Sequence, residues 1–176
     1  MWNPLLSSNV DWPGHWLWVL PAQQRMRECT GNVAGQEFLI STAQAGLGEE
    51  QHSGRTPRGW HYVRARIGAG LPADAILRGR RWQPDAIPGN DPILARILWL
   101  CGLESGRNRG GRVDSFRRFI YLHGTADRQH LGKPVSQGCI RMDPEEIIEL
   151  FPRCPVGTPV FIGDSPTPFP WPQRNS

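Results

Sequence analysis

Short apolar and β-branched runs, separated by segments rich in Gly and Pro, dominate the hydrophobic pattern of this 176-residue chain. Runs of this length, bounded by turn residues, predict strands rather than long helices. The predicted strands are Trp16–Leu20, Arg25–Cys29, Phe38–Thr42, Trp60–Ile67, Phe119–Thr125 and Val156–Ile162. In the last of them Pro159 predicts an edge strand or a bulge, because proline cannot donate a ladder hydrogen bond. The pattern therefore predicts a mainly β domain.

Two segments carry helix signals instead. Asp91 and Pro92 suit the N-cap and the first turn of a helix, which Gly102 would end. At helical spacing Ile93, Ile97 and Cys101 would share one face, which predicts that Cys101 lies in the core. Asp143-Pro144-Glu145-Glu146 shows the same cap with an acid at the third helical position. We therefore expect two or so α-helices packed on the strands.

Composition narrows the possible partners. Lys+Arg 20 against Asp+Glu 16 gives a formal charge of +4, which suits an anionic polymer but also an ordinary soluble surface. No basic run is interleaved with aromatic residues, so we expect no nucleic-acid partner. No apolar stretch approaches a membrane span, and Arg25, the first basic residue, follows the first apolar run, unlike the order in a signal peptide.

The cysteines and histidines outside the motif described next give no metal or disulfide pattern. The four cysteines form no CxxC pair and are too sparse for a disulfide scaffold. We expect His52 and His61 at the surface, since no third ligand stands at metal-site spacing. No metal and no other cofactor is therefore expected. Arg78, Arg80 and Arg81 fit either an acidic substrate or a solvated face.

One His and one Cys, each beside a Gly, carry the candidate chemistry. The run from Phe119 to Thr125 delivers His123 at the end of a buried strand, and Cys139 follows Gly138 after a short loop. A thiol nucleophile needs an imidazole within reach to take its proton, and bare backbone beside it so that a carbonyl can approach. These requirements make His123 and Cys139 candidates for catalysis.

These segments resemble the L,D-transpeptidase family, the YkuD-like catalytic domain of bacterial cell-wall enzymes. The signature is His-Gly-Thr at a strand end, then Ser-x-Gly-Cys-Ile-Arg-Met, a helix and a Gly-Thr-x-Val strand, matched here at 123–125, 136–142 and 157–160. The resemblance implies a mainly β fold, a β-sandwich of mixed sheets with packed helices and a cleft over His123 and Cys139. It divides the chain into a lead-in (1–15), a catalytic domain (16–163) and a Pro-rich tail (164–176).

The resemblance also implies roles for the site residues. Cys139 would be the nucleophile, His123 the base, and the Gly124 carbonyl would orient the imidazole. The remaining candidates for oxyanion and substrate binding are Gly138, Ser136, Gln137, Arg141 and Thr125, with Gln137 standing where members often carry His. Arg141 would either pair with a stem-peptide carboxylate or brace the loop, and Ser136 would either support the turn or touch substrate.

The implied reaction is acyl transfer on peptidoglycan stem peptides, through a thioester that releases D-alanine and is resolved by a neighbouring amine to give a cross-link. Water as acceptor would make the enzyme an L,D-carboxypeptidase, and the lack of a recognisable export signal leaves an exported wall-targeting effector open. A non-catalytic wall-binding module is the alternative from another class, since Trp 8 could supply sugar-stacking surfaces. The family implies a location in the periplasm or cell wall, and we expect a monomer.

Overall fold

The computed structural model describes residues 11–87, 89 and 91–168. Its strands are β1 (His15–Leu20), β2 (Arg25–Thr30), β3 (Val33–Ser41), β4 (Gly59–Ile67), β5 (Ile76–Arg78), β6 (Arg81–Trp82), β7 (Ile93–Gly102), β8 (Tyr121–Thr125), β9 (Ile140–Met142) and β10 (Pro159–Ile162). The α-helix within these residues is α1 (Pro144–Leu150), and short 3-10 helices cover Gly111–Val113, Arg128–His130 and Phe151–Arg153. The prediction of a mainly β domain is confirmed.

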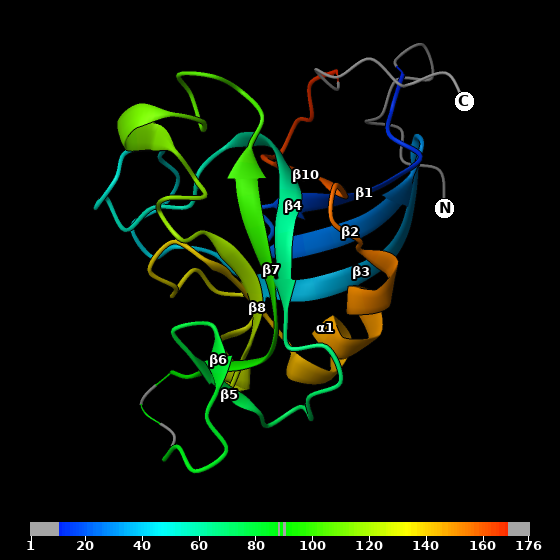
Figure 1. Ribbon diagram of the computed structural model, residues 1–176. Coiled ribbons are helices and arrows are strands. Elements are labelled where there is room, and N and C mark those ends of the chain that lie inside the picture. The colour runs from blue at the N-terminus through cyan, green and yellow to red at the C-terminus, as the bar shows by residue number, and fades with distance from the viewer. Residues whose placement is uncertain (1–10, 88, 90, 169–176) are drawn as a thin grey trace.

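The strands form one mixed sheet that closes on itself. Its order is β4-β10-β1-β2-β3-β9-β8-β7-β5-β6, and β4 pairs with β7 as well as with β10. Two pairs, β1 with β10 and β8 with β9, are parallel, and the others are antiparallel. Figure 1 shows the result as two walls, with β1, β2 and β3 running across the direction of β4, β7 and β8.

The main core lies between these walls. Leu17 and Val19 of β1, Phe38 of β3 and Leu98 of β7 are buried there with Ile147 of α1. A second cluster covers the other face of β1, where Trp16, Trp18 and Trp60 pack with Phe161. Trp60 Nε1 also donates to the carbonyl of Thr167 at 2.9 Å, which docks the first part of the tail; Trp171 lies outside the described residues.

The helix signal at Asp143 is confirmed. Its carboxylate accepts hydrogen bonds from the amides of Glu145 and Glu146, and Pro144 occupies the first turn of α1. Burial of Ile147 and Leu150 then fixes α1 against β7 and β8. The position of α1 matters for the site, because β8 carries His123.

The helix predicted from Asp91 to Gly102 is wrong. This segment is β7, which pairs with β4, β5 and β8. Leu98 and Leu100 face the main core, whereas Ile97 and Trp99 join a third cluster around Leu77 and Tyr121 on the opposite face. A strand with both faces covered has no polar–apolar alternation, so its apolar residues also matched helical spacing. Cys101 is only partly buried on this strand, contrary to prediction.

Two smaller predictions are also wrong. The strand β10 lies inside the sheet between β4 and β1, and Pro159 is tolerated because it is the first residue of that strand. His61 is fully buried rather than at the surface, with ring nitrogens bonded to Gly59 O at 3.0 Å and to Ser115 Oγ at 2.9 Å. The Gly- and Pro-rich segment before β7 also folds into a small hairpin, β5–β6.

Two features of the described residues bear on possible partners. None of their helices has the length and apolar character needed to cross a membrane. Within the same residues, no three His, Cys, Asp or Glu side chains are grouped so that they would hold a metal ion.

Candidate active site

The parallel pair β8–β9 brings His123 and Cys139 to the same face of the sheet. His123 is in register with Arg141, and Leu122 with Ile140. Cys139 precedes β9 by one residue, so it lies two residues from Arg141 and shares that side of the strand. Leu122 and Ile140 point instead into the main core. The pairing of β8 with β9 therefore places Cys139, just before β9, diagonally opposite His123 on β8.

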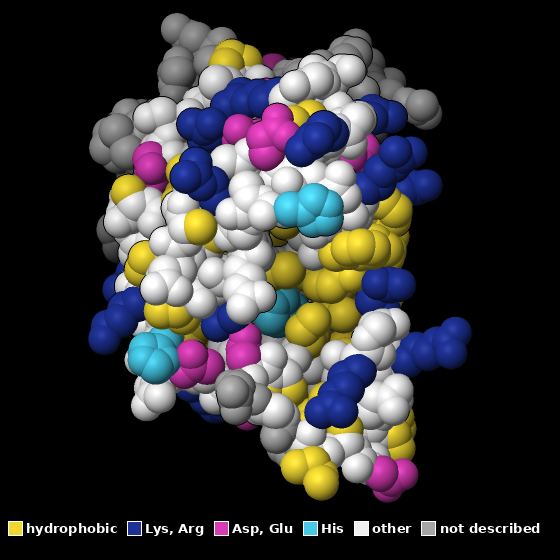
Figure 2. Space-filling view, turned by 90° about the vertical axis from the view of Figure 1, so that its left-hand side faces the viewer, with side chains coloured by type: hydrophobic (Ala, Val, Ile, Leu, Met, Phe, Trp, Pro, Cys, Tyr) yellow, Lys and Arg dark blue, Asp and Glu magenta, His cyan; other side chains and the backbone are white. Residues whose placement is uncertain are grey.

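Both side chains line a cavity of about 270 Å³. Its other walls are Asp91, Ile93, Gln137 and Arg141. Figure 2 shows the face of the molecule that is hollowed, with a histidine ring at the floor of the hollow and hydrophobic side chains along one side. The cavity therefore gives a substrate access to both candidate groups.

The buried His123 ring is held in one tautomer. Its side chain is 4% exposed, and Nδ1 lies 2.8 Å from the carbonyl oxygen of Gly124. A carbonyl oxygen only accepts hydrogen bonds, so Nδ1 carries the proton and Nε2 keeps a free lone pair. Burial lowers the pKa of His123 to about 4, partly offset by the bond to Gly124. The imidazole is therefore neutral at neutral pH.

Gly124 is needed for a second reason. A Cβ at this position would meet the carbonyl oxygen of Leu94 at 2.6 Å and Cα of Pro144 at 3.2 Å. Both neighbours are backbone atoms of packed elements, so they cannot move aside cheaply. Only glycine allows β8 to approach β7 and α1 this closely.

The Cys139 thiol is hydrogen-bonded to backbone rather than to an acidic or basic side chain. Sγ lies 3.3 Å from the carbonyl oxygen of Phe119, to which it donates, and 3.4 Å from the amide of Tyr121, from which it accepts. Phe119 reaches this arrangement with a φ of 57°, in the left-handed region. Burial raises the pKa of the Cys139 thiol to about 11, although the Tyr121 amide acts against this. The resting thiol is therefore protonated.

A network of local hydrogen bonds fixes the loop before Cys139. Ser136 Oγ donates to the Cys139 carbonyl at 2.6 Å and accepts from the Gly138 amide at 3.2 Å. Thr56, from the segment before β4, donates from Oγ1 to the Gly138 carbonyl at 2.9 Å. Gly138 has a φ of 127°, which a residue with a Cβ rarely adopts. Ser136 thus occupies the turn-supporting position, and its oxygen already engages one predicted oxyanion donor.

Arg141 forms an ion pair with Asp91, which the sequence had suggested as a helix cap. Its Nη2 lies 2.5 Å from Asp91 Oδ2, and its side chain is 11% exposed. Asp91 Oδ1 accepts a further hydrogen bond from Thr125 Oγ1 at 2.8 Å. Asp91 was predicted as a helix cap, but in the structure it lies just before β7 and joins two of the predicted site residues. Neither role that the sequence offered for Arg141 included this partner.

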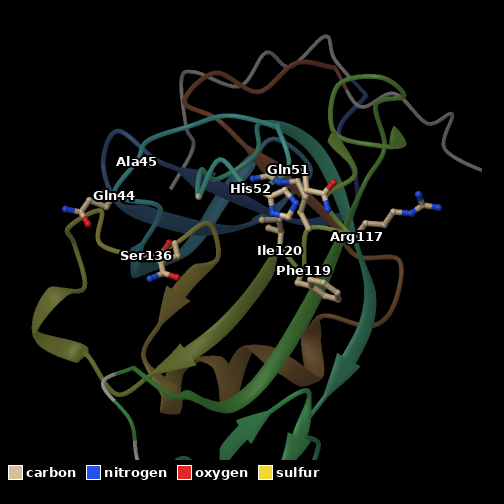
Figure 3. Close-up of a pocket in the computed structure, with 11 residues that line it drawn as sticks. Gln44, Ala45, Gln51, His52, Arg117, Phe119, Ile120 and Ser136 are labelled. Atoms are coloured by element: carbon tan, nitrogen blue, oxygen red, sulfur yellow. The ribbon is translucent and has the colours of Figure 1, made fainter. Parts of the chain in front are cut away.

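A larger cavity of about 700 Å³ lies beside the first, and Gln137 lines both. Figure 3 shows Gln51 and His52 of the 44–57 loop above it, Phe119 and Ile120 below, and Ser136 toward one end. This loop is braced by Arg118, whose guanidinium donates to the carbonyls of Gly48, Glu49 and Arg55 at 3.2, 2.8 and 2.6 Å. These hydrogen bonds hold the 44–57 loop in place over the larger cavity.

The structure brings together all eight predicted site residues, but sequence reasoning missed three others. Asp91 was concealed by its Asp-Pro pair, which is equally typical of a helix start. Phe119 acts through its carbonyl, which no side-chain motif reveals. Arg118 stands in a Gly- and Arg-rich region without periodicity. Conversely, His130 bonds Asp127 at 2.7 Å and lines neither cavity.

Comparison with known proteins gives the same family as the motif. The family model described as "L,D-transpeptidase catalytic domain" matches residues 14–162. YqjB of Bacillus subtilis (strain 168), which carries an L,D-transpeptidase name, is 46% identical over 52 residues, 30% of this chain and 30% of that protein. An L,D-transpeptidase-named protein of Fuscovulum blasticum, ORF 5 of the ATP synthase subunits region, is 51% identical over 81 residues, 46% and 35% of the two chains.

A solved L,D-transpeptidase from Mycobacterium smegmatis shares the fold, with a TM-score of 0.54 and 14% identity over 85% of this chain and 58% of that one. At that identity the likeness concerns the fold alone. The chain spans about a third of the length of the curated relatives above. The family match nevertheless covers most of the chain and includes both His123 and Cys139. This chain belongs to the family of L,D-transpeptidase catalytic domains.

Proposed function

We propose that this protein is a cysteine-dependent L,D-transpeptidase that acts on peptidoglycan stem peptides. The observation that carries the proposal is the opening of the Cys139 thiol and the His123 imidazole into one cavity from adjacent parallel strands. Cys139 is the nucleophile and His123 the base. The Gly124 carbonyl orients the imidazole in the way that a carboxylate or amide does in other triads.

The resting site is a neutral pair rather than a thiolate–imidazolium pair. The pKa of Cys139 is raised to about 11 and that of His123 is lowered to about 4, both by burial. Complete proton transfer before attack would therefore be strongly uphill. In the proposed first step, Sγ leaves the Phe119 carbonyl, and His123 Nε2 takes its proton as sulfur bonds to the donor carbonyl carbon.

The developing oxyanion needs a donor close to the sulfur. The Gly138 amide already donates to Ser136 Oγ, whereas no hydrogen bond to the Cys139 amide is found within the described residues. The Cys139 amide is therefore the donor in this proposal, contributing on the order of 3 kcal/mol to transition-state stabilisation. Collapse of the tetrahedral species breaks the bond to the leaving D-alanine nitrogen, which receives the proton from His123.

The thioester then transfers its acyl group to an amine. The acceptor amine loses its proton to His123 as nitrogen bonds to the carbonyl carbon, and the sulfur leaves and regains a proton. Two cavities of about 270 and 700 Å³ that meet at Gln137 support transfer over hydrolysis, because an acyl transferase must hold a donor and an acceptor on either side of the nucleophile. Gln137 in this proposal contacts substrate on both sides.

Arg141 and Thr125 have supporting roles in this proposal. The Asp91 carboxylate already neutralises Arg141 and accepts the Thr125 hydroxyl. Arg141 therefore keeps the wall of the small cavity in place through Asp91, and it is not free to pair with a carboxylate of the substrate unless Asp91 withdraws.

The nucleophile is tested by intact-protein mass after incubation with a carbapenem or a donor tetrapeptide. We expect the wild type to gain the mass of one acyl group and Cys139→Ala to gain none. Cys101→Ala is the matched control, because Cys101 is also a partly exposed free thiol. Acylation of Cys139→Ala at the wild-type rate would overturn the assignment.

Products from tetrapeptide muropeptides distinguish the acceptors. Cross-linked dimers support transfer, and tripeptides without dimers would show an L,D-carboxypeptidase. Binding to sacculi without any acylation at Cys139 would instead indicate a wall-binding module. We place the activity in the periplasm or cell wall, where its substrate lies; lysis on periplasmic but not cytoplasmic expression would identify a wall-targeting effector.

A further inference from the structure

The arginines around the two cavities differ in the groups that their guanidinium ions contact. Arg141 is paired with Asp91, and Arg118 is bound to backbone carbonyls. Arg117 lines the larger cavity, but its side chain points away from the other lining residues (Figure 3). Arg141 and Arg118 therefore already use guanidinium donors on groups of the protein, and Arg117 is turned away from the cavity.

Arg80, in the turn between β5 and β6, is held differently. Its guanidinium carbon lies 4.8 Å from the ring centre of Trp99 and 5.4 Å from that of Phe119, so the group is stacked on aromatic faces. Nη1 donates to the hydroxyl of Tyr121 at 3.2 Å. The residue is exposed, and among the described residues no carboxylate lies within ion-pair distance of it.

This arrangement orders the side chain without using up its donors. An arginine guanidinium has five N–H groups in a planar fork, and Tyr121 accepts only one hydrogen bond. The Trp99 ring is fixed in turn, since it stacks on Phe116 at 4.0 Å between ring centres and its Nε1 donates to the Phe116 carbonyl at 3.0 Å. A cation that is already ordered loses little conformational entropy when it binds an anion.

The same residues lead directly to the sulfur. Tyr121, whose hydroxyl accepts from Arg80, donates its backbone amide to Cys139 Sγ at 3.4 Å. Phe119, whose ring lies under Arg80, offers its carbonyl to the same sulfur and is half exposed in the wall of the larger cavity. Arg80 therefore stands about one tyrosine side chain away from Cys139, and it contacts Phe119, which lines the larger cavity.

We propose that Arg80 is a specificity-determining residue that binds a carboxylate of the peptide donor during acylation of Cys139. The planar fork suits a two-point contact with a carboxylate, which an amide cannot reproduce. An extended peptide advances by about 3.4 Å per residue, so the carboxylate belongs to the acylated residue or lies within about two residues of it. The inference rests on the proposed function of Cys139. It assigns to Arg80 the pairing with a substrate carboxylate that Arg141 cannot make while it is bound to Asp91.

The experiment measures acylation of Cys139 by a stem tetrapeptide with free carboxylates and by forms in which each carboxylate in turn is converted to its primary amide. The variants are Arg80→Gln, Arg80→Lys and, as matched control, Arg81→Gln. Arg81 is an exposed arginine of the same hairpin for which no side-chain hydrogen bond or ion pair is found within the described residues. Thermal unfolding of each variant checks that the hairpin is intact.

We expect Arg80→Gln to lower acylation efficiency by roughly ten- to a hundredfold on the free-carboxylate donor, the loss typical of a hydrogen bond to a charged group. The loss should disappear on one of the amidated donors, and that donor identifies the carboxylate. Arg80→Lys should recover part of the rate, and Arg81→Gln should match the wild type.

Equal losses for Arg80→Gln and Arg81→Gln, or an Arg80→Gln deficit that is the same on every amidated donor, would overturn the role of Arg80 while leaving the nucleophile in place. If no donor acylates the wild-type protein at Cys139, the proposed function itself fails, and the role of Arg80 fails with it. The two failures are therefore distinguishable in one set of measurements.

Discussion

Two buried histidines, one on β4 and one on β8, make the same hydrogen bond through Nδ1 but differ in what lies next to Nε2. His61 and His123 each bond a backbone carbonyl through Nδ1, at 3.0 and 2.8 Å, and burial lowers the pKa of each to about 4. The difference is at Nε2. In His61 this atom accepts from the buried Ser115 hydroxyl, whereas His123 lines a cavity that it shares with Cys139.

The comparison shows that a strongly lowered pKa is no evidence of catalysis by itself. Burial is the largest cause of the lowered pKa in both residues, and nearby arginines add to it. What separates them is that the Nε2 of His61 is engaged by Ser115, whereas His123 lines a cavity together with the proposed nucleophile Cys139. His61 is, by this criterion, a structural residue that ties β4 to the segment leading to Phe119.

The largest expected difference between the two histidines is in acylation rate. Replacing His123 by Gln removes the base, so acylation of Cys139 by a carbapenem should fall by roughly 10²- to 10⁴-fold. His61→Gln, the matched variant, should acylate within a few-fold of the wild type, because Gln can still bond Ser115. Rates are followed by intact-protein mass, with circular dichroism to confirm folding. Similar losses in both variants would contradict the assignment of His123 as base and of His61 as a structural residue.

The next effect is on stability in acid, where the two histidines should behave alike. An unfolded His titrates near 6.5, whereas the pKa of folded His61 is about 4. Between these values the unfolded state binds more protons, so the free energy of unfolding rises with pH and is lost as pH falls from 6.5 toward 4. One such histidine contributes at most about 3 kcal/mol to this loss.

Urea unfolding at pH 7.5 and pH 4 measures this loss directly. We expect the stability gap between the wild type and His61→Gln to narrow in acid, because the variant has no imidazole to protonate, and the same for His123→Gln. The carboxylates of Glu28, Glu49 and Asp114, whose pKa values are lowered, titrate in all three proteins and cancel in the difference. A gap that stays constant with pH would show that the imidazoles are protonated in the folded state as readily as in the unfolded one.

The two histidines also show how far the sequence could lead. The His-Gly-Thr and Ser-x-Gly-Cys segments were enough to predict the family and the fold class, both of which are confirmed. The same segments single out Cys139 and His123 as candidates for nucleophile and base, and the structure places both in one cavity. His61, by contrast, was expected at the surface but is fully buried on β4. Its partner Ser115 is 54 residues away, and no local pattern could reveal that contact.

The error over β7 has the same origin. Apart from Arg96, the residues from Ile93 to Leu100 are apolar on both faces, since the main core covers one and the cluster around Tyr121 covers the other. Only the tertiary pairing with β4, β5 and β8 decides between strand and helix there. That pairing also places Asp91, predicted as a helix cap, in the wall of the cavity that His123 and Cys139 line.

The smallest predicted effect concerns Asp91. It tests whether Asp91 and Arg141 have opposite effects on the pKa of Cys139. Asp91 raises the pKa of Cys139 and Arg141 lowers it, and the two side chains are in contact. Asp91→Asn should therefore shift the pH profile of Cys139 alkylation by iodoacetamide downward by roughly half a unit to one unit, and Arg141→Gln should shift it upward.

Peptide mapping separates Cys139 from Cys101, whose profile serves as an internal reference in every variant. Shifts of the same sign in both variants would mean that a structural rearrangement, rather than the opposing charges, controls the sulfur. Opposite shifts would mean that the ion pair of Asp91 and Arg141 in the cavity wall sets the reactivity of Cys139.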